Sequence, residues 1–430
     1  MTTPNWLNGL YLTTQEVLQY PDYITRLRDE IGLNTAVLSF TGEMSKEVLA
    51  LSPYQGRIPT HAELDNLVLR HFDGRPVDPQ EYDRAQAHCG PGVSDNGDDV
   101  QFRKAVKQLK DAGLNVWICG GAWTIRRLMF CPSQENIQAW MEAACVHWAT
   151  QYGIDALDIT HFRYPMGSFP LGLFGCTCPS CTSTATDMGY DMGKMIGDLK
   201  GARAGLQKLD GKRLGDVVRL GFGFFDVIHA LGLRSGVLDW VRFRCDLVTR
   251  NLARFRGAVH KAAPGVAFGT DTYPASMALT AGHDYLRWGD MADFASPLVS
   301  HISAFIVNTF IEWARFLQEE IPNLTEEDAL QLIYRFNGYD GMALPKTIAA
   351  YKADEAATLA DRIPTADVVL RDLVKAKLYL PPDMPSYPII HGEGWPIEIV
   401  NHIVNEARQL GHNGIVWQGT SELMAYDFKK

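Results

Sequence analysis

The chain has 430 residues, of which 46% are hydrophobic and 21% are charged, an ordinary composition for a soluble globular protein. Its net charge of -10 leaves no basic surplus to neutralise phosphates, so nucleic acid is not expected as a partner. The N-terminal stretch MTTPNWLNGLYL lacks the basic region and apolar core of a signal peptide, and no apolar run reaches transmembrane length. We therefore expect a cytoplasmic protein with no membrane partner.

The first half of the chain alternates predicted strands with predicted helices. Short apolar runs predict the strands, and apolar residues at helical spacing predict the helices. The predicted strands are 7–12, 35–40, 115–119 and the stretch GIDALDITHFRYP at 153–165, and the predicted helices are 21–30, 98–112 and 133–148. Strands that alternate with helices through short connections require a parallel sheet.

The second half continues this alternation. Further strands are predicted at 266–270, 293–299, 387–391 and 414–418, and helices at 184–208, 237–263, 305–317 and 396–410. The segment 217–228 fits either a strand or a helix, and a helical region at 325–376 begins with a capping box at Thr325 and Asp328.

Eight predicted strands, each but the last followed by a helix, indicate an α/β protein with a (β/α)8 TIM barrel fold. Long insertions are expected after strands 2, 4 and 6, at about 44–97, 166–183 and 320–385. Residues 1–430 are then expected to form a single barrel that is one catalytic domain.

The fourth predicted strand carries the first candidate for chemistry. Leu157 and Ile159 alternate with Asp158, and because they are expected to face the covering helices, Asp158 should point into the barrel. His161 and Arg163 follow at the C-terminal end of the strand, where barrel enzymes place their active sites. A structural ion pair between Asp158 and Arg163 is the alternative interpretation.

Carboxylates and aromatic residues gather at the predicted strand ends. Paired carboxylates among aromatic side chains suit glycoside cleavage, because one carboxyl protonates the leaving oxygen and the other attacks or activates water. The predicted catalytic residues are Asp158, Asp271 and Glu393, with Glu422 as a further candidate beside Glu43. A raised pKa near the apolar Trp395 would suit Glu393 to be the general acid. The predicted substrate contacts are Glu43, Trp123, His161, Arg163, Tyr273, His301, His391, Trp395 and Trp417.

The stretch GIDALDITHFRYP resembles the GxDGIxxDxxRxP motif of bacterial glycosyl-hydrolase-like (β/α)8 barrel families. The resemblance extends to GLYLT, GLNTAVLS, DWVRFRCDLV, HDYLRWGDMADFASPLVSH and NGIVWQGT, in an order that spans most of the chain. It implies the barrel fold and a glycoside hydrolase activity of broad definition.

Two departures separate the chain from the patterns that it resembles. The aspartate of the family motif falls at Thr160, and Asp158 lies two residues earlier on the same face, one layer deeper. Asp158, Asp271 and Glu393 also look distantly like the alpha-amylase arrangement, but the arginine that precedes the nucleophile in that family falls at Ala156. Either the acid has moved, or the usual chemistry has been lost.

The segment CTCPSC holds Cys176, Cys178 and Cys181 at metal-ligand spacing. A structural zinc site needs a fourth ligand, for which Cys131, Cys89 or a histidine are candidates. Reduced thiols without metal are the alternative, and a disulfide is less expected in a cytoplasm. Eight cysteines in a chain of this length do not suggest a secreted disulfide scaffold.

Three functions remain in view. The leading hypothesis is a glycoside hydrolase acting on a carbohydrate substrate, with no cofactor required for catalysis. A metal-dependent barrel hydrolase or isomerase would use His161, His301 and His391 with acids, although no HxH or HExxH spacing supports it. A non-catalytic sugar-binding barrel is the third. The sequence leaves the sugar, the linkage, the stereochemical outcome and a homo-oligomeric state open.

Overall fold

The computed structural model describes residues 6–52, 60–70, 83, 98–121, 124–125, 128–164, 171–352, 356–391 and 395–419. Within these ranges, eight parallel strands form one sheet in the order β8-β7-β6-β3-β2-β1-β10-β9. The strands are β1 (Leu7–Leu12), β2 (Thr35–Ser39), β3 (Asn115–Gly121), β6 (Ala156–Thr160), β7 (Ala267–Thr272), β8 (Phe294–Pro297), β9 (Ile389–Ile390) and β10 (Gly414–Trp417). Each predicted strand has an observed counterpart, with ends that differ by a few residues.

The two edge strands of this sheet meet and close it. The backbone N–H of Ala295 donates to the carbonyl of Pro385 at 2.9 Å, and the N–H of Tyr387 donates to the carbonyl of Ala295 at 2.8 Å. These bonds join β8 to the segment that leads into β9. The predicted (β/α)8 barrel is therefore confirmed.

Alternate residues of the strands fill the inside of the barrel. Their apolar members form a core cluster of their own, made of Leu7, Val37, Trp117, Ala156, Phe294, Leu298, Tyr387, Ile389 and Val416. Leu157 and Ile159 belong instead to the larger core between the sheet and the helices. Asp158 lies between them in the strand, so it faces inward, as the alternation predicts. Gly269 on β7 makes room for the ring of Phe294, which a Cβ there would meet at 2.1 Å.

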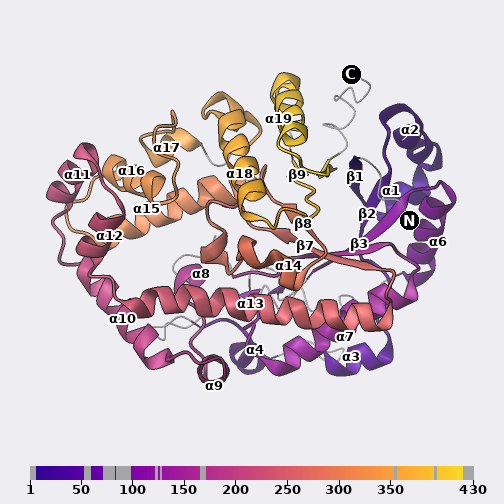
Figure 1. Cartoon of the computed structure of the whole chain (residues 1–430), viewed down its shortest axis with the longest axis horizontal. Helices are drawn as coiled ribbons and strands as arrows, with labels where there is room; N and C mark the ends of the chain where they lie inside the picture. Colours follow the sequence, from indigo (N-terminus) through magenta and orange to yellow (C-terminus); the bar gives the residue numbers. More distant parts are fainter. Residues whose placement is uncertain are drawn as a thin grey trace.

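Helices surround the sheet (Figure 1). In the first half they are α1 (Thr14–Gln19), α2 (Pro21–Ile31), α3 (Lys46–Leu51), α4 (His61–Leu67), α6 (Asp99–Asp111) and α7 (Glu135–Gln151). Between β6 and β7 they are α8 (Leu171–Phe174), α9 (Pro179–Asp187), α10 (Met192–Leu206), α11 (Gly211–Leu220), α12 (Phe224–Leu231) and α13 (Ser235–Ala262). After β7 they are α14 (Trp288–Met291), α15 (Asn308–Glu320), α16 (Glu326–Phe336), α17 (Ile348–Tyr351), α18 (Thr365–Tyr379) and α19 (Ile397–Gln409).

Shorter elements complete the described part of the chain. A small antiparallel ribbon joins β4 (Thr124–Ile125) to β5 (Leu128–Met129) after β3. Single helical turns lie at η1 (Ala278–Ala281), η2 (Tyr285–Arg287) and η4 (Ala356–Asp361), and η3 (Ile302–Val307) is a π-helical turn that leads into α15.

The long connection between β6 and β7 differs from the prediction. A single helix was expected at 184–208, but the chain breaks after α9, where Gly189 has a φ of 81°, and starts again at α10, which Asp191 caps. The ambiguous segment 217–228 is helical and divides between α11 and α12. Glycine disrupts helices at both places, since it adopts backbone conformations that other residues avoid.

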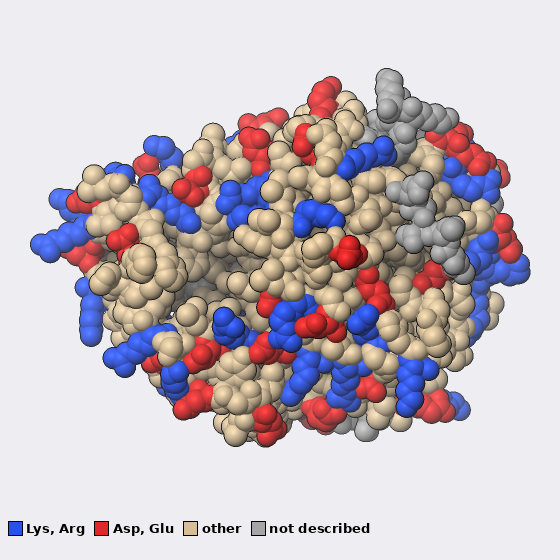
Figure 2. Space-filling model, viewed as in Figure 1, with Lys and Arg blue, Asp and Glu red and all other residues tan. Residues whose placement is uncertain are grey.

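Helices α10, α11 and α12 pack with α15 and α16 into a helical lobe beside the barrel. Figure 1 shows this lobe at the left and the strands at the right, with the long helix α13 running beneath both. Basic and acidic side chains are interspersed over the visible face (Figure 2). Within the described ranges, no helix is both long and apolar enough to cross a membrane.

Candidate active site

Two carboxylates project into the barrel from neighbouring strands. In the strand register Asp158 of β6 lies level with Gly269 of β7, and Asp271 follows two residues later. Asp271 is therefore one layer nearer the C-terminal mouth, and both side chains are buried. Burial and the nearby charge of Asp271 raise the pKa of Asp158 to about 7. Asp158 can thus hold a proton near neutral pH.

The deeper carboxylate, Asp158, is held from across the barrel. The hydroxyl of Tyr11 on β1 donates to Oδ2 of Asp158 at 2.9 Å. Burial, followed by the charge of Asp158, raises the pKa of Tyr11 well above its usual value, so the phenol remains a donor. Oδ1 of Asp158 is buried and has no hydrogen-bond partner among the residues that the structure describes. A hydroxyl or other polar group of a ligand would satisfy that oxygen.

The outer carboxylate, Asp271, is held by the end of β6. The hydroxyl of Thr160 donates to Oδ2 of Asp271 at 2.7 Å and lies 2.9 Å from Nδ1 of His161. Because the hydroxyl has one proton and gives it to Asp271, Nδ1 of His161 must be the donor in the second bond. His161 has a φ of 64°, and this left-handed conformation turns the chain away from the strand.

Arg163 completes this side of the mouth. Its Nη1 lies 3.9 Å from Oδ2 of Asp271, and both side chains are buried. The guanidinium lies over the rings of Tyr273 and Phe305, at 5.3 Å and 5.0 Å from their centroids. The ion pair of Arg163 therefore involves Asp271, and the alternative interpretation that paired Arg163 with Asp158 is wrong.

A second group of predicted residues follows the ends of β8, β9 and β10. Nε2 of His301 lies 2.5 Å from Oε1 of Gln418, and the ring of His301 lies 5.5 Å from that of His391. Burial, then the neighbouring His391, lowers the pKa of His301 to about 4, so its ring is neutral at pH 7. Phe305 stacks on His301 at 5.2 Å and also contacts Tyr273, so it joins the two groups.

Three predicted contacts lie elsewhere. Trp417 faces the helices, where its fully buried indole donates to Oδ1 of Asn8 at 2.9 Å, so the expected substrate contact is wrong. Glu43 is exposed, and its backbone carbonyl accepts a hydrogen bond from Tyr152. Trp395 is half-buried against the core between sheet and helices.

Some predicted residues fall outside the part of the chain that the structure describes. These residues are Trp123, Glu393, Glu422 and Cys89. The sequence argument also missed Tyr11 and Gln418, which contact Asp158 and His301. Both follow from the same alternation that oriented Asp158: Leu7, Gly9 and Tyr11 share one face of β1, and Gln418 shares a face with Val416.

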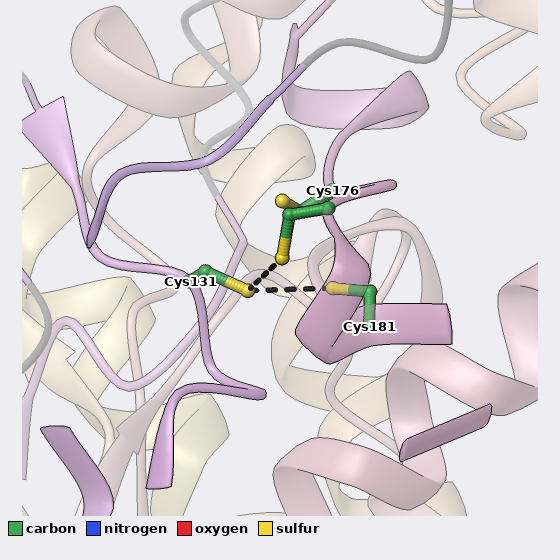
Figure 3. A group of neighbouring side chains, drawn as sticks. Cys131, Cys176 and Cys181 are labelled. Carbon is green, nitrogen blue, oxygen red and sulfur yellow. Dashed lines mark hydrogen bonds between the residues drawn. The ribbon is translucent and has the colours of Figure 1, made fainter. Parts of the chain in front are cut away.

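A separate cluster of four cysteines lies outside the barrel. Cys131 lies just after β5, and it meets Cys176 and Cys178 from the segment between α8 and α9 and Cys181 from the first turn of α9. Their four sulfur atoms all lie within 4.8 Å of one another, and all four residues are buried. Figure 3 shows Cys131 approaching Cys176 and Cys181 from the opposite side. The backbone N–H of Arg70 donates to the sulfur of Cys176 at 3.1 Å.

Among the described residues, this cluster is the only group of three or more His, Cys, Asp or Glu side chains close enough to share a metal ion. His161, His301 and His391 do not form such a group. The prediction that Cys176, Cys178 and Cys181 lie close together is confirmed. Cys131, one of the predicted candidates for a fourth ligand, completes the cluster. The seven cysteines within the described ranges form no disulfide.

No protein-family model matches the sequence, and no curated protein matches it. The structure is similar to the glycoside hydrolase domain of PgaB (BpsB) from Bordetella bronchiseptica, with a TM-score of 0.49 and 9% identity, over 98% of this chain and 95% of that chain. It is similar to a β-galactosidase from Halorubrum lacusprofundi, with a TM-score of 0.46 and 12% identity, over 96% of this chain and 52% of that chain. It is also similar to a β-galactosidase from Marinomonas ef1, with a TM-score of 0.47 and 9% identity, over 96% of this chain and 53% of that chain.

This chain spans about half the length of those two β-galactosidases. At such identities and scores, its function has to be judged from its own residues.

Proposed function

We propose that the chain is a glycoside hydrolase that cleaves a glycosidic bond at the C-terminal mouth of its barrel. The observation that carries this proposal is the pair of inward carboxylates, Asp158 and Asp271, on neighbouring strands. Their environments differ, since Asp158 tends to keep a proton while Thr160 and Arg163 stabilise a negative charge on Asp271. Glycoside hydrolysis needs such a division between a proton donor and an ionised carboxylate.

The roles follow from this difference. Asp271, nearer the mouth, is proposed as the carboxylate that attacks the sugar or activates water. The general acid is Asp158, whose pKa of about 7 suits a donor at neutral pH, or Glu393, which follows His391 by two positions in the chain. His161, Arg163, Tyr273, His301 and His391, together with Trp123, remain proposed substrate contacts. The activity class EC 3.2.1.- belongs to this proposal.

A panel of 4-nitrophenyl α- and β-glycosides, including N-acetylglucosaminides, tests the proposal in the purified protein. Asp271→Asn should lower turnover by at least about 10²-fold, the range of general acid–base and nucleophilic contributions, and so should whichever of Asp158→Asn and Glu393→Gln removes the general acid. Asp290→Asn is the control, because Asp290 is an exposed carboxylate on α14. Full activity in Asp271→Asn, or in both Asp158→Asn and Glu393→Gln, would refute the assignment and turn attention to Glu43 and Glu422.

Two alternatives lead to different outcomes of the same experiment. A sugar-binding barrel without catalysis would bind oligosaccharides in calorimetry while releasing no nitrophenol from any glycoside. A metal-dependent hydrolase would lose activity in chelator and regain it with a divalent metal. The described residues favour neither alternative with a specific observation.

We also propose that Cys131, Cys176, Cys178 and Cys181 bind a structural zinc ion. Tetrahedral zinc with Zn–S bonds of about 2.3 Å places its sulfur ligands about 3.8 Å apart. The contacts between Cys131 and Cys181 at 3.3 Å and between Cys131 and Cys178 at 3.6 Å are close to that spacing. The N–H donated to Cys176 is also what a zinc-bound thiolate accepts. A zinc ion here would link the β5 loop to α9.

A further inference from the structure

A cavity of about 220 Å³ lies in the helical lobe, apart from the barrel mouth. Helices α8, α10 to α13, α15 and α16 contribute its walls, among them Leu206, Phe222, Trp240, Phe316 and Phe336. The surface that lines it is wholly apolar. Figure 2 shows the face of the molecule hollowed left of its centre, between the positions of α12 and α8 in Figure 1.

This lining restricts the chemistry of an occupant. Protein interiors are packed as densely as organic crystals, and an empty cavity costs stability because its lining loses contacts. A polar ligand would leave its own hydrogen-bonding groups unsatisfied against such walls. An engineered apolar cavity of about 150 Å³ stays dry and binds benzene, so a cavity of this size can take hydrocarbon. The matching ligand group is an alkyl chain.

The lip of the cavity is also apolar. Helix α12 has no buried residue, and Phe224 and Phe225 at its start are 67% and 75% exposed. Leu220 at the end of α11 is 89% exposed, and Phe222 between them lines the cavity. A hydrocarbon chain that leaves the cavity therefore meets further apolar surface at the lip.

The segment that carries α10 to α12 is basic, although the chain is acidic and helices α15 and α16, which also line the cavity, are acidic. Residues 194–234 contain eight Lys or Arg and four Asp, in a chain of net charge -10. Asp210 and Asp226 cap the starts of α11 and α12, so those carboxylates are engaged with backbone N–H groups. Lys208, Lys212 and Arg213 are exposed, and no ion pair is found for them within the described ranges. Figure 2 shows basic side chains at this end of the molecule.

We propose that this cavity binds the hydrocarbon chain of a single-chain anionic amphiphile, such as a long-chain carboxylate. The chain fills the apolar cavity, and the anionic head group remains outside it, among the basic residues of α10 to α12. This site is independent of the carboxylates in the barrel and of the proposed glycoside hydrolysis.

Fluorescence titration with cis-parinaric acid, an 18-carbon carboxylate, tests the proposal in the full chain. Ala202 lines the cavity from α10, so Ala202→Leu should fill part of it and weaken binding at least tenfold. Ala204→Leu is the matched control, because Ala204 is exposed on the same helix. Ala230→Leu fills the cavity from α12 and provides a second variant, with circular dichroism to verify folding. No saturable binding, or equal affinity in Ala202→Leu and Ala204→Leu, would overturn the proposal.

Two further measurements distinguish an anionic ligand inside the cavity from a probe on the lip and from a dimer contact. Decanoate should displace the probe at least several-fold better than decyltrimethylammonium, which has the same chain length and the opposite charge; equal displacement contradicts an anionic ligand. The double variant Phe224→Ser with Phe225→Ser should retain binding of the probe. If this double variant lost binding while Ala202→Leu kept it, the probe would bind at the exposed lip and not in the cavity. Sedimentation that shows a dimer abolished by Ala202→Leu would identify a second copy as the occupant and overturn the proposal.

Discussion

The hydroxyl of Tyr11 on β1 donates a 2.9 Å hydrogen bond to Oδ2 of Asp158 on β6, across the interior of the barrel. A hydrogen bond to a carboxylate favours the ionised form, so this bond opposes the effects of burial and of Asp271, which raise the pKa of Asp158. The resulting pKa of about 7 is thus a balance between these effects. That balance can be shifted by single substitutions.

Removal of the Tyr11 hydroxyl should raise the pKa of Asp158 further. A hydrogen bond to a charged group contributes about 1.5–3 kcal/mol, so Tyr11→Phe should shift this pKa upward by roughly one unit or more. The measurement is the pH dependence of the Asp158 carboxyl carbon in ¹³C NMR. Tyr387→Phe is the control, because Tyr387 also lies inside the barrel and its hydroxyl has no described bond to Asp158. An unchanged titration in Tyr11→Phe would contradict this account.

Asp158 should also affect the stability of the fold as a function of pH. Its pKa is about 7 in the folded protein and about 3.9 in an unfolded chain, so the folded state binds the extra proton between these values. The stability that Asp158 contributes is therefore fully present below about pH 4 and is lost as the pH rises to about 7. The loss is on the order of 4 kcal/mol at about 1.4 kcal/mol per pH unit.

His301 has the opposite effect on the free energy of unfolding, over nearly the same pH range. Its pKa is about 4 in the folded protein and about 6.5 when unfolded, so acidification below pH 6.5 protonates the unfolded chain first and destabilises the fold. The two effects partly cancel in the wild type, and urea unfolding of single variants separates them. The stability of Asp158→Asn relative to the wild type should rise from pH 4 to pH 7, whereas the exposed control Asp290→Asn should show a flat difference. A flat difference in Asp158→Asn would mean that Asp158 is ionised throughout.

The cysteine cluster should carry about one zinc ion per chain. Elemental analysis of purified protein measures it directly, and Cys131→Ala should reduce it to near zero. Loss of structural zinc should also lower the melting temperature, because metal binding contributes folding free energy. Cys145→Ala is the matched control, since Cys145 is buried on α7 outside the cluster. Absence of zinc from the wild type would favour four reduced thiols.

The elements that sequence patterns predicted well are those that local alternation determines. The period of two in β6 oriented Asp158 correctly, because Leu157 and Ile159 need the apolar side of the sheet. The same period of two, applied to β10, places Val416 inside the barrel and Trp417 on the side of the helices. The expectation that Trp417 contacts the substrate did not take this alternation into account. Aromatic character alone does not say which face of a strand a residue takes.

Long-range neighbours could not be read from local patterns. Cys131 lies 45 residues before Cys176, and only the folding of the β5 loop against α9 shows that it, rather than a histidine, joins the cluster. The pairing of Arg163 with Asp271 likewise depends on how far the chain turns after β6, where His161 takes a left-handed conformation. Spacing in the sequence limits such partners but does not select among them.

Thr160 stands where the resembling families carry an aspartate, and its contacts define what that departure does. Its hydroxyl donates to Oδ2 of Asp271 at 2.7 Å, so an aspartate at this position would put a second carboxylate within hydrogen-bond reach of the first. Two carboxylates that close cannot both ionise without a cost, and they tend to share one proton. Thr160→Asp should therefore be less stable at pH 8 than at pH 5, relative to the wild type at each pH.

Two milder variants at the same position separate charge from hydrogen bonding. Thr160→Val keeps the shape and removes the hydroxyl, so it should lower turnover by at least about tenfold if Asp271 acts as the nucleophile or base, given that a hydrogen bond to a charged group contributes about 1.5–3 kcal/mol. Thr160→Ser retains the donor and should stay close to wild-type turnover. Equal stability of Thr160→Asp at both pH values, together with full activity of Thr160→Val, would show that the contact between Thr160 and Asp271 has no part in the chemistry.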